Sequence, residues 1–517
     1  MTGVLEARNL AGEATARPAC VRVAPAAADV ADLLRDESRM TAAGVASVAE
    51  PSSVDELRQV LAWHASQGHA VTVSGARTGV AGGAVPETST HLVSVAKLRG
   101  VTAIDLTRTP ATVCALAGTT LRELQAALAE QARGFALPLD PTEAGASVGG
   151  MVATNAAGSR AYRFGATRDW VHALTVELAS GRTLPLTRGV DRAEGDAVAL
   201  ADGDTRTAHL AAIPKPHTKN SIGYGFSTGG DVLDLFIGSE GTLGVVSEVT
   251  FRLMPVTESR LAFLQCLASP AQAFDLVDAI RADEGLRTTA LEFLDARSHE
   301  LARETGKAEV LRVLAQAPPG SCSLFAEFGY DDDAQLESTI ERVLTHVAAV
   351  GGDESAGLAG VDEAVLKDIR AFRHAVPERI NATIAERRQQ HPALHKIATD
   401  MAVENQHLRW VYDLYSSRLT AAGLDHAIFG HVGNNHFHVN ILPKDEDELV
   451  RAKTIYREFA TALVARGGCV SAEHGIGRIK KAFLPAQYGE ETLATMRAAK
   501  RWLDPDWRLN PGVLIDP

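Results

Sequence analysis

The sequence predicts an α+β fold with a glycine-rich first half and a second half built on an antiparallel sheet. Up to about residue 256, strand-like runs alternate with loops of glycine and other small residues. Beyond this point the expected elements follow the order strand, helix, strand, strand, helix, which is typical of an antiparallel sheet backed by helices.

A length of 517 residues allows two or three domains, because single hydrophobic cores stop growing at about 250–300 residues. We expect a first domain over residues 1–256, a second over 257–483, and a C-terminal segment over 484–517 that packs back on the first. Pro255 closes the glycine-rich half. The final stretch LDPDWRLNPGVL marks a closing turn through its Pro and Gly.

Residues 51–68 are expected to form the first helix. Ser52 or Ser53 can cap its N-terminus, and Glu56 stands at the capping-box spacing from Ser53. Apolar residues then recur on one face until Gly68.

The other elements follow from the same signals. Strands are expected at 69–73, 109–118, 172–181, within 236–255, and at 261–268, 290–295 and 322–330. Helices are expected at 119–131, with Thr119 as its cap, at 271–282, at 333–352, and within 484–517.

Composition and charge restrict the function. The formal net charge of -13 argues against a nucleic-acid partner, because phosphate binding relies on clustered Lys and Arg. The five cysteines show no CxxC spacing, which argues against a disulfide framework and against Cys-ligated zinc or iron–sulfur sites. The sequence has neither a signal-peptide core nor a run of 18 apolar residues. We expect a cytoplasmic protein, with peripheral docking at the inner membrane as the alternative.

The loop SGARTGVAGGAVP, residues 74–86, places Gly75, Gly79, Gly82 and Gly83 directly after a strand. Glycines let backbone N–H groups approach an oxyanion, so such a loop can hold a pyrophosphate. The spacing matches neither GxGxxG nor GxxxxGK[ST], which disfavours a Rossmann site and a P-loop. A tight turn after a strand is the structural alternative.

Residues 146–171 form a surface nearly bare of large side chains between Gly149 and Gly158. A flat aromatic ligand can lie against such a surface, and Thr154, Asn155 and Ser159 can hydrogen-bond its edges. Close packing of helices is the alternative interpretation.

Three histidines lie within GHVGNNHFHVN, residues 430–440. On a strand, His436, His438 and Asn440 share one face because side chains alternate. Gly433 and the two asparagines after it favour a turn, which can bring His431 round to His438. Two imidazoles held in this way form half of a metal site.

A third ligand is offered by VSAEHGIGRIK, residues 470–480, in which Glu473 precedes His474. Imidazole and carboxylate ligands suit zinc, manganese or iron, and catalytic sites commonly use three protein ligands. Hydrogen-bonded structural histidines in a well-packed strand are the alternative.

Four stretches in order resemble the FAD-binding domain of the vanillyl-alcohol-oxidase or para-cresol-methylhydroxylase type: SGARTGVAGGAVP, DPTEAGASVGGMVATNAAGSRAYRFGATRDWV, KNSIGYG and FIGSEGTLGVVSEVTFRL. Over residues 35–515 the chain resembles the FAD-dependent D-2-hydroxyacid dehydrogenases, which include D-lactate dehydrogenase, the glycolate oxidase catalytic subunit and D-2-hydroxyglutarate dehydrogenase. The resemblance implies a two-subdomain FAD-binding domain followed by a substrate or cap domain with a metal site.

The same resemblance implies a set of FAD-binding residues. They are Gly75, Ala76, Arg77, Thr78, Gly79, Gly82, Pro138, Asp140, Ser147, Gly150, Asn155, Gly158, Glu240 and Gly244. Some relatives attach the flavin through a histidine of the glycine loop. Residues 74–86 contain no histidine, so we expect non-covalent FAD.

The second half resembles the family pattern HxGDGNxHxN followed by EHGxG. This match implies His431, His438 and Glu473 as metal ligands, Asn440 as a substrate contact and His474 as the general base.

The chain departs from that pattern at Asn434, Asn435 and His436, where Asp, Gly and Asn are common. One carboxylate near the metal is lost and one imidazole is gained. The metal therefore stays open between zinc, manganese and iron, with zinc favoured. His436 can also replace His431 as a ligand, because HxH is a chelating spacing.

The resemblance points to Arg373 and Lys396 as the cations that hold the substrate carboxylate, whereas Arg370 and Arg379 are expected on a solvated helix face. In the implied reaction the metal polarises the substrate hydroxyl and His474 removes its proton. The C2 hydrogen passes as hydride to flavin N5, which gives a 2-keto acid.

D-lactate or a similar short D-2-hydroxy acid is the favoured substrate. D-2-hydroxyglutarate and glycolate are the alternatives, and the former needs a further cation, such as Arg370 or Arg379. Without CxxCH or iron–sulfur motifs in the sequence, the electron acceptor is expected to be external: a quinone, a cytochrome or an electron-transfer flavoprotein. A homodimer is left open.

Two other classes compete with this interpretation. A metallohydrolase would use the histidines and Glu473 to activate water and would be colourless. A non-catalytic flavin-binding subunit would keep the fold with a degenerate site, and the presence of Arg373, Lys396 and His474 counts against it.

Overall fold

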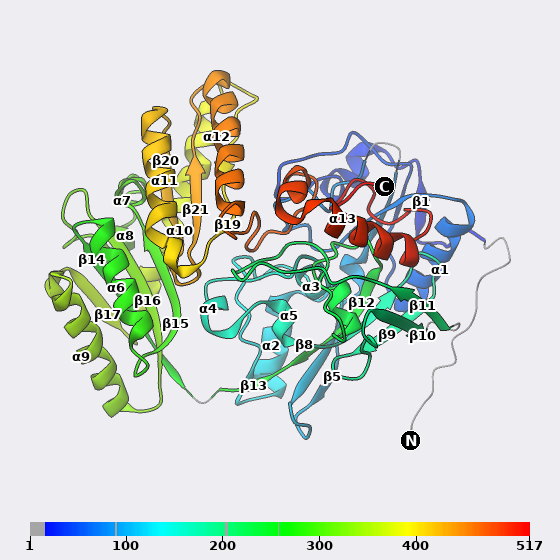
Figure 1. Cartoon of the computed structure of the whole chain (residues 1–517), viewed down its shortest axis with the longest axis horizontal. Coiled ribbons are helices and arrows are strands. Elements are labelled where there is room, and N and C mark those ends of the chain that lie inside the picture. The colour runs from blue at the N-terminus through cyan, green and yellow to red at the C-terminus, as the bar shows by residue number, and fades with distance from the viewer. Residues whose placement is uncertain (1–15, 88–89, 202–204, 257) are drawn as a thin grey trace.

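A computed structural model describes residues 16–87, 90–201, 205–256 and 258–517. The first half forms one lobe, and most of the second half forms another (Figure 1). Two predicted domain starts lie outside the described residues: residues 1–15, at the start of the first domain, and residue 257, the first residue of the second domain. The proposed domain limits stay a prediction.

The first lobe begins with a four-stranded sheet of order β1-β2-β4-β3, in which β2, β4 and β3 run parallel and β1 is antiparallel. Its elements are β1 (Val21–Val23), β2 (Ser47–Ala49), α1 (Val54–Ser66), β3 (Val71–Ser74) and β4 (His91–Ser94). Helix α1 buries Leu57, Val60 and Leu61 in the same core as Val71 and Val93. The glycine loop at 74–86 follows β3 directly.

The caps of the first two helices follow the sequence closely. Ser53 accepts a hydrogen bond from the backbone N–H of Glu56 at the start of α1, as predicted. For α2 (Leu121–Gln131) the predicted cap is wrong by one residue. Thr120 forms the reciprocal capping box with Glu123, whereas the Thr119 hydroxyl accepts from the N–H of Gly100 and holds the preceding turn.

A second, five-stranded sheet of order β5-β6-β12-β8-β9 completes the lobe, with all neighbours antiparallel. Its strands are β5 (Val101–Asp105), β6 (Thr112–Leu116), β8 (Val171–Glu177), β9 (Thr183–Thr187) and β12 (Val245–Arg252). Beside it lie α3 (Val148–Thr154), α4 (Ala161–Phe164), α5 (Thr167–Trp170), and the pairs β7 (Phe135–Ala136) with β13 (Met254–Pro255) and β10 (Ala197–Ala201) with β11 (Thr205–His209). The expected two subdomains therefore correspond to two sheets.

The second lobe is built on an eight-stranded antiparallel sheet, here called the cap sheet. Its order is β17-β14-β16-β15-β20-β21-β18, and β19 also pairs with β21. The strands are β14 (Ser259–Leu267), β15 (Arg287–Leu294), β16 (Cys322–Tyr330), β17 (Gly357–Gly360), β18 (Ile397–Ala398), β19 (Met401–Ala402), β20 (His426–His431) and β21 (His436–Ile441). The predicted antiparallel sheet is confirmed.

Helices cover both faces of the cap sheet, because apolar residues alternate along its strands. Phe263 and Phe293 share one core with α6 (Pro270–Ala282), α9 (Asp333–Ala349), α11 (Leu408–Ala421) and α12 (Glu446–Val464). Leu264 and Phe325 share the other with α7 (Ala296–Arg303), α8 (Ala308–Val313) and α10 (Glu363–Arg387).

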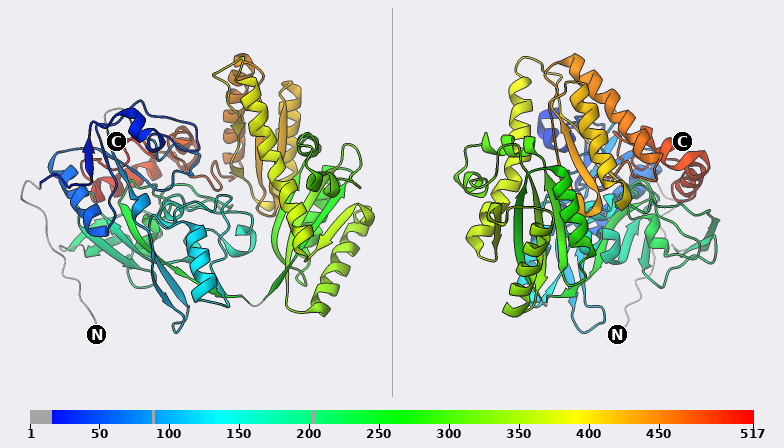
Figure 2. Two further views of the ribbon diagram at one scale, coloured as in Figure 1. Left: turned by 180° about the vertical axis from the view of Figure 1, so that it is seen from behind. Right: turned by 60° about the vertical axis from the view of Figure 1, so that its left-hand side comes forward.

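The C-terminal segment returns to the first lobe, where α13 (Leu484–Leu503) lies beside the N-terminal elements in the views of Figures 1 and 2. The buried ammonium of Lys500 donates to the carbonyl of Thr242 and pairs with Asp504. The Asn510 side chain accepts from the N–H of Val73 and donates to the carbonyl of Glu240. The chain end is thus fastened to both glycine-bearing loops of the first lobe.

Candidate active site

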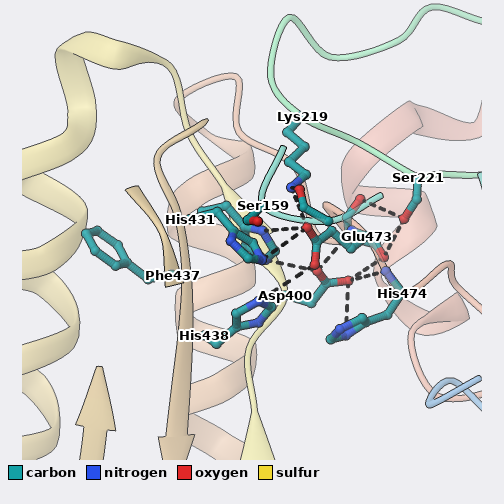
Figure 3. A network of polar contacts seen from close by, with 12 residues as sticks. Ser159, Lys219, Ser221, Asp400, His431, Phe437, His438, Glu473 and His474 are labelled. Atoms are coloured by element: carbon teal, nitrogen blue, oxygen red, sulfur yellow. Dashed lines mark hydrogen bonds and ion pairs between the residues drawn. The ribbon is translucent and has the colours of Figure 1, made fainter. Parts of the chain in front are cut away.

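One face of the cap sheet carries the polar residues of the candidate site. Glu292 lies on β15, His431 on β20, and His436, His438 and Asn440 on β21. Alternation places these five side chains on the face that α10 covers, while the residues between them enter the opposite core. In Figure 3 the ring of Phe437 accordingly points away from His438.

A hairpin brings the histidines together, as the sequence predicts. Strands β20 and β21 pair with His431 opposite His436, and residues 432–434 form the turn. Asn435 closes the turn at a φ of 51°, a conformation that Asn tolerates better than most residues and that suits the Gly of the family pattern. Its side chain accepts from Arg281 and donates to the carbonyl of Val403, so this departure from the pattern is structural.

Glu473 meets this face from the segment 470–480. Its carboxylate lies 3.3 Å from His431 Nε2, 3.7 Å from His438 Nε2 and 3.9 Å from His436 Nδ1. One donor atom of each of these four residues lies within 4.8 Å of the others. The structure therefore brings the three predicted ligands together and adds His436 as a fourth donor.

Lys219, which the sequence analysis left without a role, compensates the charge of Glu473. Its ammonium bonds the Glu473 carboxylate and the carbonyl of Gly158, and both charged side chains are buried (Figure 3). Lys219 begins the KNSIGYG stretch, so the motif indicated the loop but not this pairing.

Opposing effects set the charge states of His431 and Glu473. Burial lowers the pKa of His431, but Glu473 and Glu292 outweigh it and raise that pKa to about 9. Burial raises the pKa of Glu473, but Lys219 and His431 outweigh it and hold the pKa well below its usual range. His431 is accordingly a cation beside an anionic Glu473 at neutral pH, and binding a metal would require it to release a proton.

The other two histidines of the hairpin are neutral. Burial lowers the pKa of His436 to about 4 and holds the pKa of His438 well below its usual range. His436 is fully buried, and its Nε2 lies 3.1 Å from Asp400 Oδ1. Neither of its ring nitrogens has a well-aligned hydrogen-bond partner in the described part of the chain. A buried imidazole without such partners is unusual and is free to coordinate a cation.

Asp400, in the turn between β18 and β19, fixes the segment that carries Glu473 and His474. It accepts 3.0 Å hydrogen bonds from the N–H groups of both residues and one from the Ser471 hydroxyl, and it pairs with Lys480. Burial raises the pKa of Asp400, but His474, Lys480 and His436 outweigh it and hold the pKa well below its usual range. No sequence signal marks this residue beyond an acid in a short turn.

His474 has the environment of a base. Its Nδ1 lies 3.5 Å from Asp400 Oδ2, and its ring stands parallel to that of His438, with centroids 5.6 Å apart. Burial lowers the pKa of His474, although Asp400 opposes the shift. A neutral imidazole oriented by a carboxylate can accept a proton.

The two predicted substrate cations occupy different environments. Arg373 forms a bidentate pair with Glu292 at 2.6 and 2.7 Å and stacks on Phe325, and Glu292 in turn contacts His431 Nδ1 at 3.1 Å. Lys396 lines the cavity described next, and burial lowers its pKa. Only Lys396 of this pair is therefore without a carboxylate partner in the described structure.

A cavity of about 1500 Å³ joins the two lobes. Its lining includes Gly75 and Gly79 of the first glycine loop, Gly150 of α3, and His438, Glu473 and His474. Asn440 and Lys396 line it too, so most residues of the predicted site face one space.

The glycine loops show features of an anion cradle. No described residue accepts a hydrogen bond from the backbone N–H of Arg77, Thr78 or Gly79, of which the first two are half-buried and Gly79 is exposed. A Cβ at Gly75 would lie 2.4 Å from Ser147 Oγ, so the two loops touch only because Gly75 lacks a side chain. Space around Gly79 is open. These loops fit a pyrophosphate in the cavity.

Not every predicted cofactor contact reaches the lining. Ala76, Arg77, Thr78, Ser147, Glu240 and Gly244 line the cavity along with the glycines named above, whereas Gly82, Pro138, Asp140, Asn155 and Gly158 do not. Asp140 accepts from Ser159 and Arg160, and the close approach of its carbonyl leaves no room for a Cβ at Gly158. Asn155 ends α3 at a φ of 48°. These contacts hold the loops in shape.

Glu240 links the first lobe to the segment 470–480. Its carboxylate accepts hydrogen bonds of 2.7 and 2.8 Å from the N–H groups of Ile476 and Gly477. Burial raises the pKa of Glu240 to about 7, although these two donors oppose the shift.

Basic residues gather on the cavity wall, and most of them were not singled out by the sequence analysis. Besides Arg77 of the glycine loop and the predicted Lys396, four cations line it without a carboxylate partner among the described residues, so that five stand apart from that loop: Arg39, Arg388, Lys396, Lys453 and Arg457. Glu37 lines the same cavity but forms no ion pair with any of them within the described structure. Arg370 and Arg379, the predicted alternatives, instead pair with surface carboxylates away from the lining. These five residues come from four separate segments of the chain, so no local sequence pattern predicts them as a group.

Comparisons with known proteins agree with this architecture. Residues 45–187 match the family described as FAD binding domain, and residues 257–514 match FAD linked oxidases, C-terminal domain. The chain is 31% identical to the D-2-hydroxyglutarate dehydrogenase of Xanthomonas citri pv. viticola, over 95% of this chain and 93% of that one. The chain belongs to the FAD-linked oxidase family. The predicted FAD-dependent dehydrogenase class and the FAD cofactor are thereby confirmed.

Other members of this FAD-linked oxidase family and two solved structures extend the comparison. The D-lactate dehydrogenase of Anaerostipes hadrus is 29% identical over 90% of this chain and 88% of its own. The structure of p-cresol methylhydroxylase matches with a TM-score of 0.68 at 15% identity, over 96% and 94% of the two chains. The 4-ethylphenol oxidase of Gulosibacter chungangensis matches with a TM-score of 0.65 at 16% identity, over 95% and 93%. The predicted fold of the vanillyl-alcohol-oxidase type is confirmed.

We expect Asp400→Asn to reduce the free energy of unfolding by about 3–5 kcal/mol, because it leaves the buried ammonium of Lys480 without a counter-charge. Denaturant unfolding of the FAD-loaded protein measures this. The double variant Asp400→Asn/Lys480→Met should regain part of the loss. A double variant no more stable than Asp400→Asn alone would show that Asp400 acts through its backbone contacts instead.

Proposed function

We propose that this protein oxidises a D-2-hydroxy acid to the 2-keto acid, with FAD as the hydride acceptor, a divalent metal beside the substrate and His474 as the base. The observation that carries the proposal is the shared cavity. Its wall places unpaired amides of the glycine loop and the His438–Glu473–His474 group around one space. A flavin ring and a small hydroxy acid need such a common space.

The donor set fits a divalent metal. His431, His438 and Glu473 supply two imidazoles and a carboxylate, and His436 offers a third imidazole. This combination suits zinc first and manganese or iron next. When bound, such an ion supplies Lewis acidity to the substrate oxygens. The Glu292 carboxylate lies against His431 Nδ1, the nitrogen that would not bind the metal. Carboxylates commonly hold this nitrogen in metal-bound histidines.

The other side chains bind and orient the substrate. Lys396 and Asn440 face the cavity and would hold the carboxylate and a neighbouring oxygen. Arg373 is already paired with Glu292, so we propose that it acts on the site through Glu292 and His431 as well as by its charge. His474, oriented by Asp400, would take the hydroxyl proton.

The electron acceptor is proposed to be external to the chain. One relative, from Arabidopsis thaliana, is named D-lactate dehydrogenase [cytochrome], mitochondrial, and is 29% identical over 74% of this chain and 59% of its own. Among the described residues, no helix is both long and apolar enough to cross a membrane.

Removing the base tests the proposed chemistry. We expect His474→Ala to retain FAD but to slow anaerobic flavin reduction by about 10²–10⁴-fold, the usual contribution of a general base. Stopped-flow absorbance with D-lactate, D-2-hydroxyglutarate and their L-enantiomers measures this. His426→Ala, on the same strand β20 as His431 but bonded to the Leu424 carbonyl, is the matched control.

Two results would contradict the proposal. Undiminished flavin reduction in His474→Ala would remove the base assignment. A wild-type protein purified without flavin absorbance would favour the metallohydrolase.

Removing a ligand tests the metal. We expect His438→Ala to lower metal affinity by more than about 100-fold, since even outer-shell changes cost 10–100-fold, and to lower turnover together with it. Metal content by mass spectrometry and steady-state rates measure the two effects. His436→Asn, which restores the family residue, should keep three ligands and bind metal more weakly than wild type. Full metal occupancy in an inactive His438→Ala would assign His438 another role.

The unpaired cations favour a dicarboxylate as a second candidate substrate, although D-lactate remains the prediction from sequence. Burial and then Lys453, Arg388 and Arg39 lower the pKa of His395, the neighbour of Lys396. Burial and then Arg39 lower the pKa of Lys396, and Arg457 lines the same cavity. A short hydroxy acid has one carboxylate for these charges. A substrate such as D-2-hydroxyglutarate brings a second carboxylate, which a charge-assisted hydrogen bond would hold.

We expect Arg457→Met to raise the concentration of D-2-hydroxyglutarate needed for half-maximal flavin reduction by about 10–100-fold, the value of a hydrogen bond to a charged group. The concentration of D-lactate needed for half-maximal flavin reduction should change little. Anaerobic flavin titrations with both acids measure this, with Arg370→Met as the exposed control. Equal effects on both substrates would indicate that the cations serve the first carboxylate or the flavin.

A further inference from the structure

A second group of three histidines lies outside the candidate active site. His64 stands in the last turn of α1, His69 just before β3, and His91 is the first residue of β4. Strands β3 and β4 are parallel neighbours, with Val71 opposite His91, so the helix end and both strand starts meet at one edge. The glycine loop leaves the opposite end of β3.

The distances between the rings match those of imidazoles around one ion. His64 Nδ1 and His69 Nδ1 lie 3.2 Å apart. Two nitrogens at about 2.0–2.1 Å from a tetrahedral zinc are separated by about 3.3 Å. One ring nitrogen of His91 lies within 4.8 Å of one nitrogen on each of the other two rings. The ring centroids of His69 and His91 are 3.8 Å apart. The two rings are stacked with an angle of 15° between their planes, so a three-nitrogen site requires the side chain of His91 to rotate.

The hydrogen bonds of the three rings leave nitrogens available. The hydroxyl of Ser47 lies 2.8 Å from His91 Nδ1. When His91 Nδ1–H donates to this hydroxyl, the lone pair of the ring is at Nε2. The two facing Nδ1 atoms of His64 and His69 can share only one hydrogen. His64 is 1% exposed, and its Nε2 has no hydrogen-bond partner among the described residues. No protein group therefore fixes the tautomer of His64.

The three imidazoles are neutral, as ligands must be. Burial lowers the pKa of His64 to about 3 and that of His91 to about 4, and the neighbouring histidines add to both shifts. Burial also lowers the pKa of His69. A set with three imidazoles and no carboxylate disfavours magnesium and calcium, which take oxygen ligands, and favours zinc, copper or nickel.

We infer that His64, His69 and His91 form a second metal site, selective for an imidazole-binding transition ion such as zinc. His69 and His91 are partly exposed, so water can enter and take the fourth position. The site joins α1 to the starts of β3 and β4, which carry the glycine loop at their far end. It would act as a structural clamp and is independent of the proposed dehydrogenase activity.

Zinc titration of the chelator-treated, FAD-loaded full chain tests this, with bound zinc read by mass spectrometry and calorimetry. We expect two zinc ions per chain in the wild type and one in His69→Ala/His91→Ala. In His438→Ala, which disables the candidate active site, one ion should remain and should raise the unfolding temperature by a few degrees. His209→Ala removes an exposed histidine of neither group and should bind as the wild type does.

The His438→Ala protein gives the decisive result, because its His64, His69 and His91 are intact. One bound zinc that disappears on adding His91→Ala supports the site. No bound zinc in His438→Ala overturns it, as does an unchanged stoichiometry in His69→Ala/His91→Ala. If the latter variant loses its FAD or its circular dichroism, Ser47→Ala provides the milder test, because weakening the orientation of His91 should reduce zinc affinity without removing a ligand.

Discussion

Two buried carboxylates, Asp400 and Glu473, determine much of the arrangement around the candidate site. Each lies in a place where burial alone would favour the neutral acid, and each is paired with a lysine from a different part of the chain. Lys219 comes from the first lobe and Lys480 from the C-terminal part, so the charge balance requires both to be folded against the cap sheet. A buried charge left alone costs several kcal/mol, which makes these pairings obligatory for the native state.

The same balance leaves the histidines with different properties. His431 lies between two carboxylates and is a cation, whereas His436, His438 and His474 are neutral because burial outweighs the attraction of the acids nearby. A divalent ion bound by these residues would add the positive charge that His431 and Lys219 now supply. Internal cations thus hold the proposed ligand residues close together, at distances that a metal would shorten.

Local sequence signals predicted the elements well and the long-range partners poorly. The hairpin around His431 follows from strand alternation and the turn residues Gly433 and Asn435, so its histidines could be placed on one face beforehand. Glu473 was found because it stands in a recognisable motif. By contrast, the pairing of Arg373 with Glu292 joins α10 to β15 across 81 positions, and no spacing rule reports such a contact. The missed cap at Thr120 is of another kind, because the capping-box spacing from Thr120 to Glu123 distinguishes it from Thr119 and could have selected it from the sequence.

Glu240 explains how the flavin cradle and the acid/base group keep a fixed relation. Its backbone carbonyl accepts from Asn510, whose side chain also accepts from the N–H of Val73, just before the glycine loop. Its carboxylate accepts hydrogen bonds from the backbone amides of Ile476 and Gly477, close after His474 in the chain. The glycine loop and the proposed base are therefore linked through one residue and its hydrogen bonds. Because catalysis of this type depends on placing donor and acceptor atoms within a fraction of an ångström, a short rigid link of this kind matters more than the stability of either lobe alone.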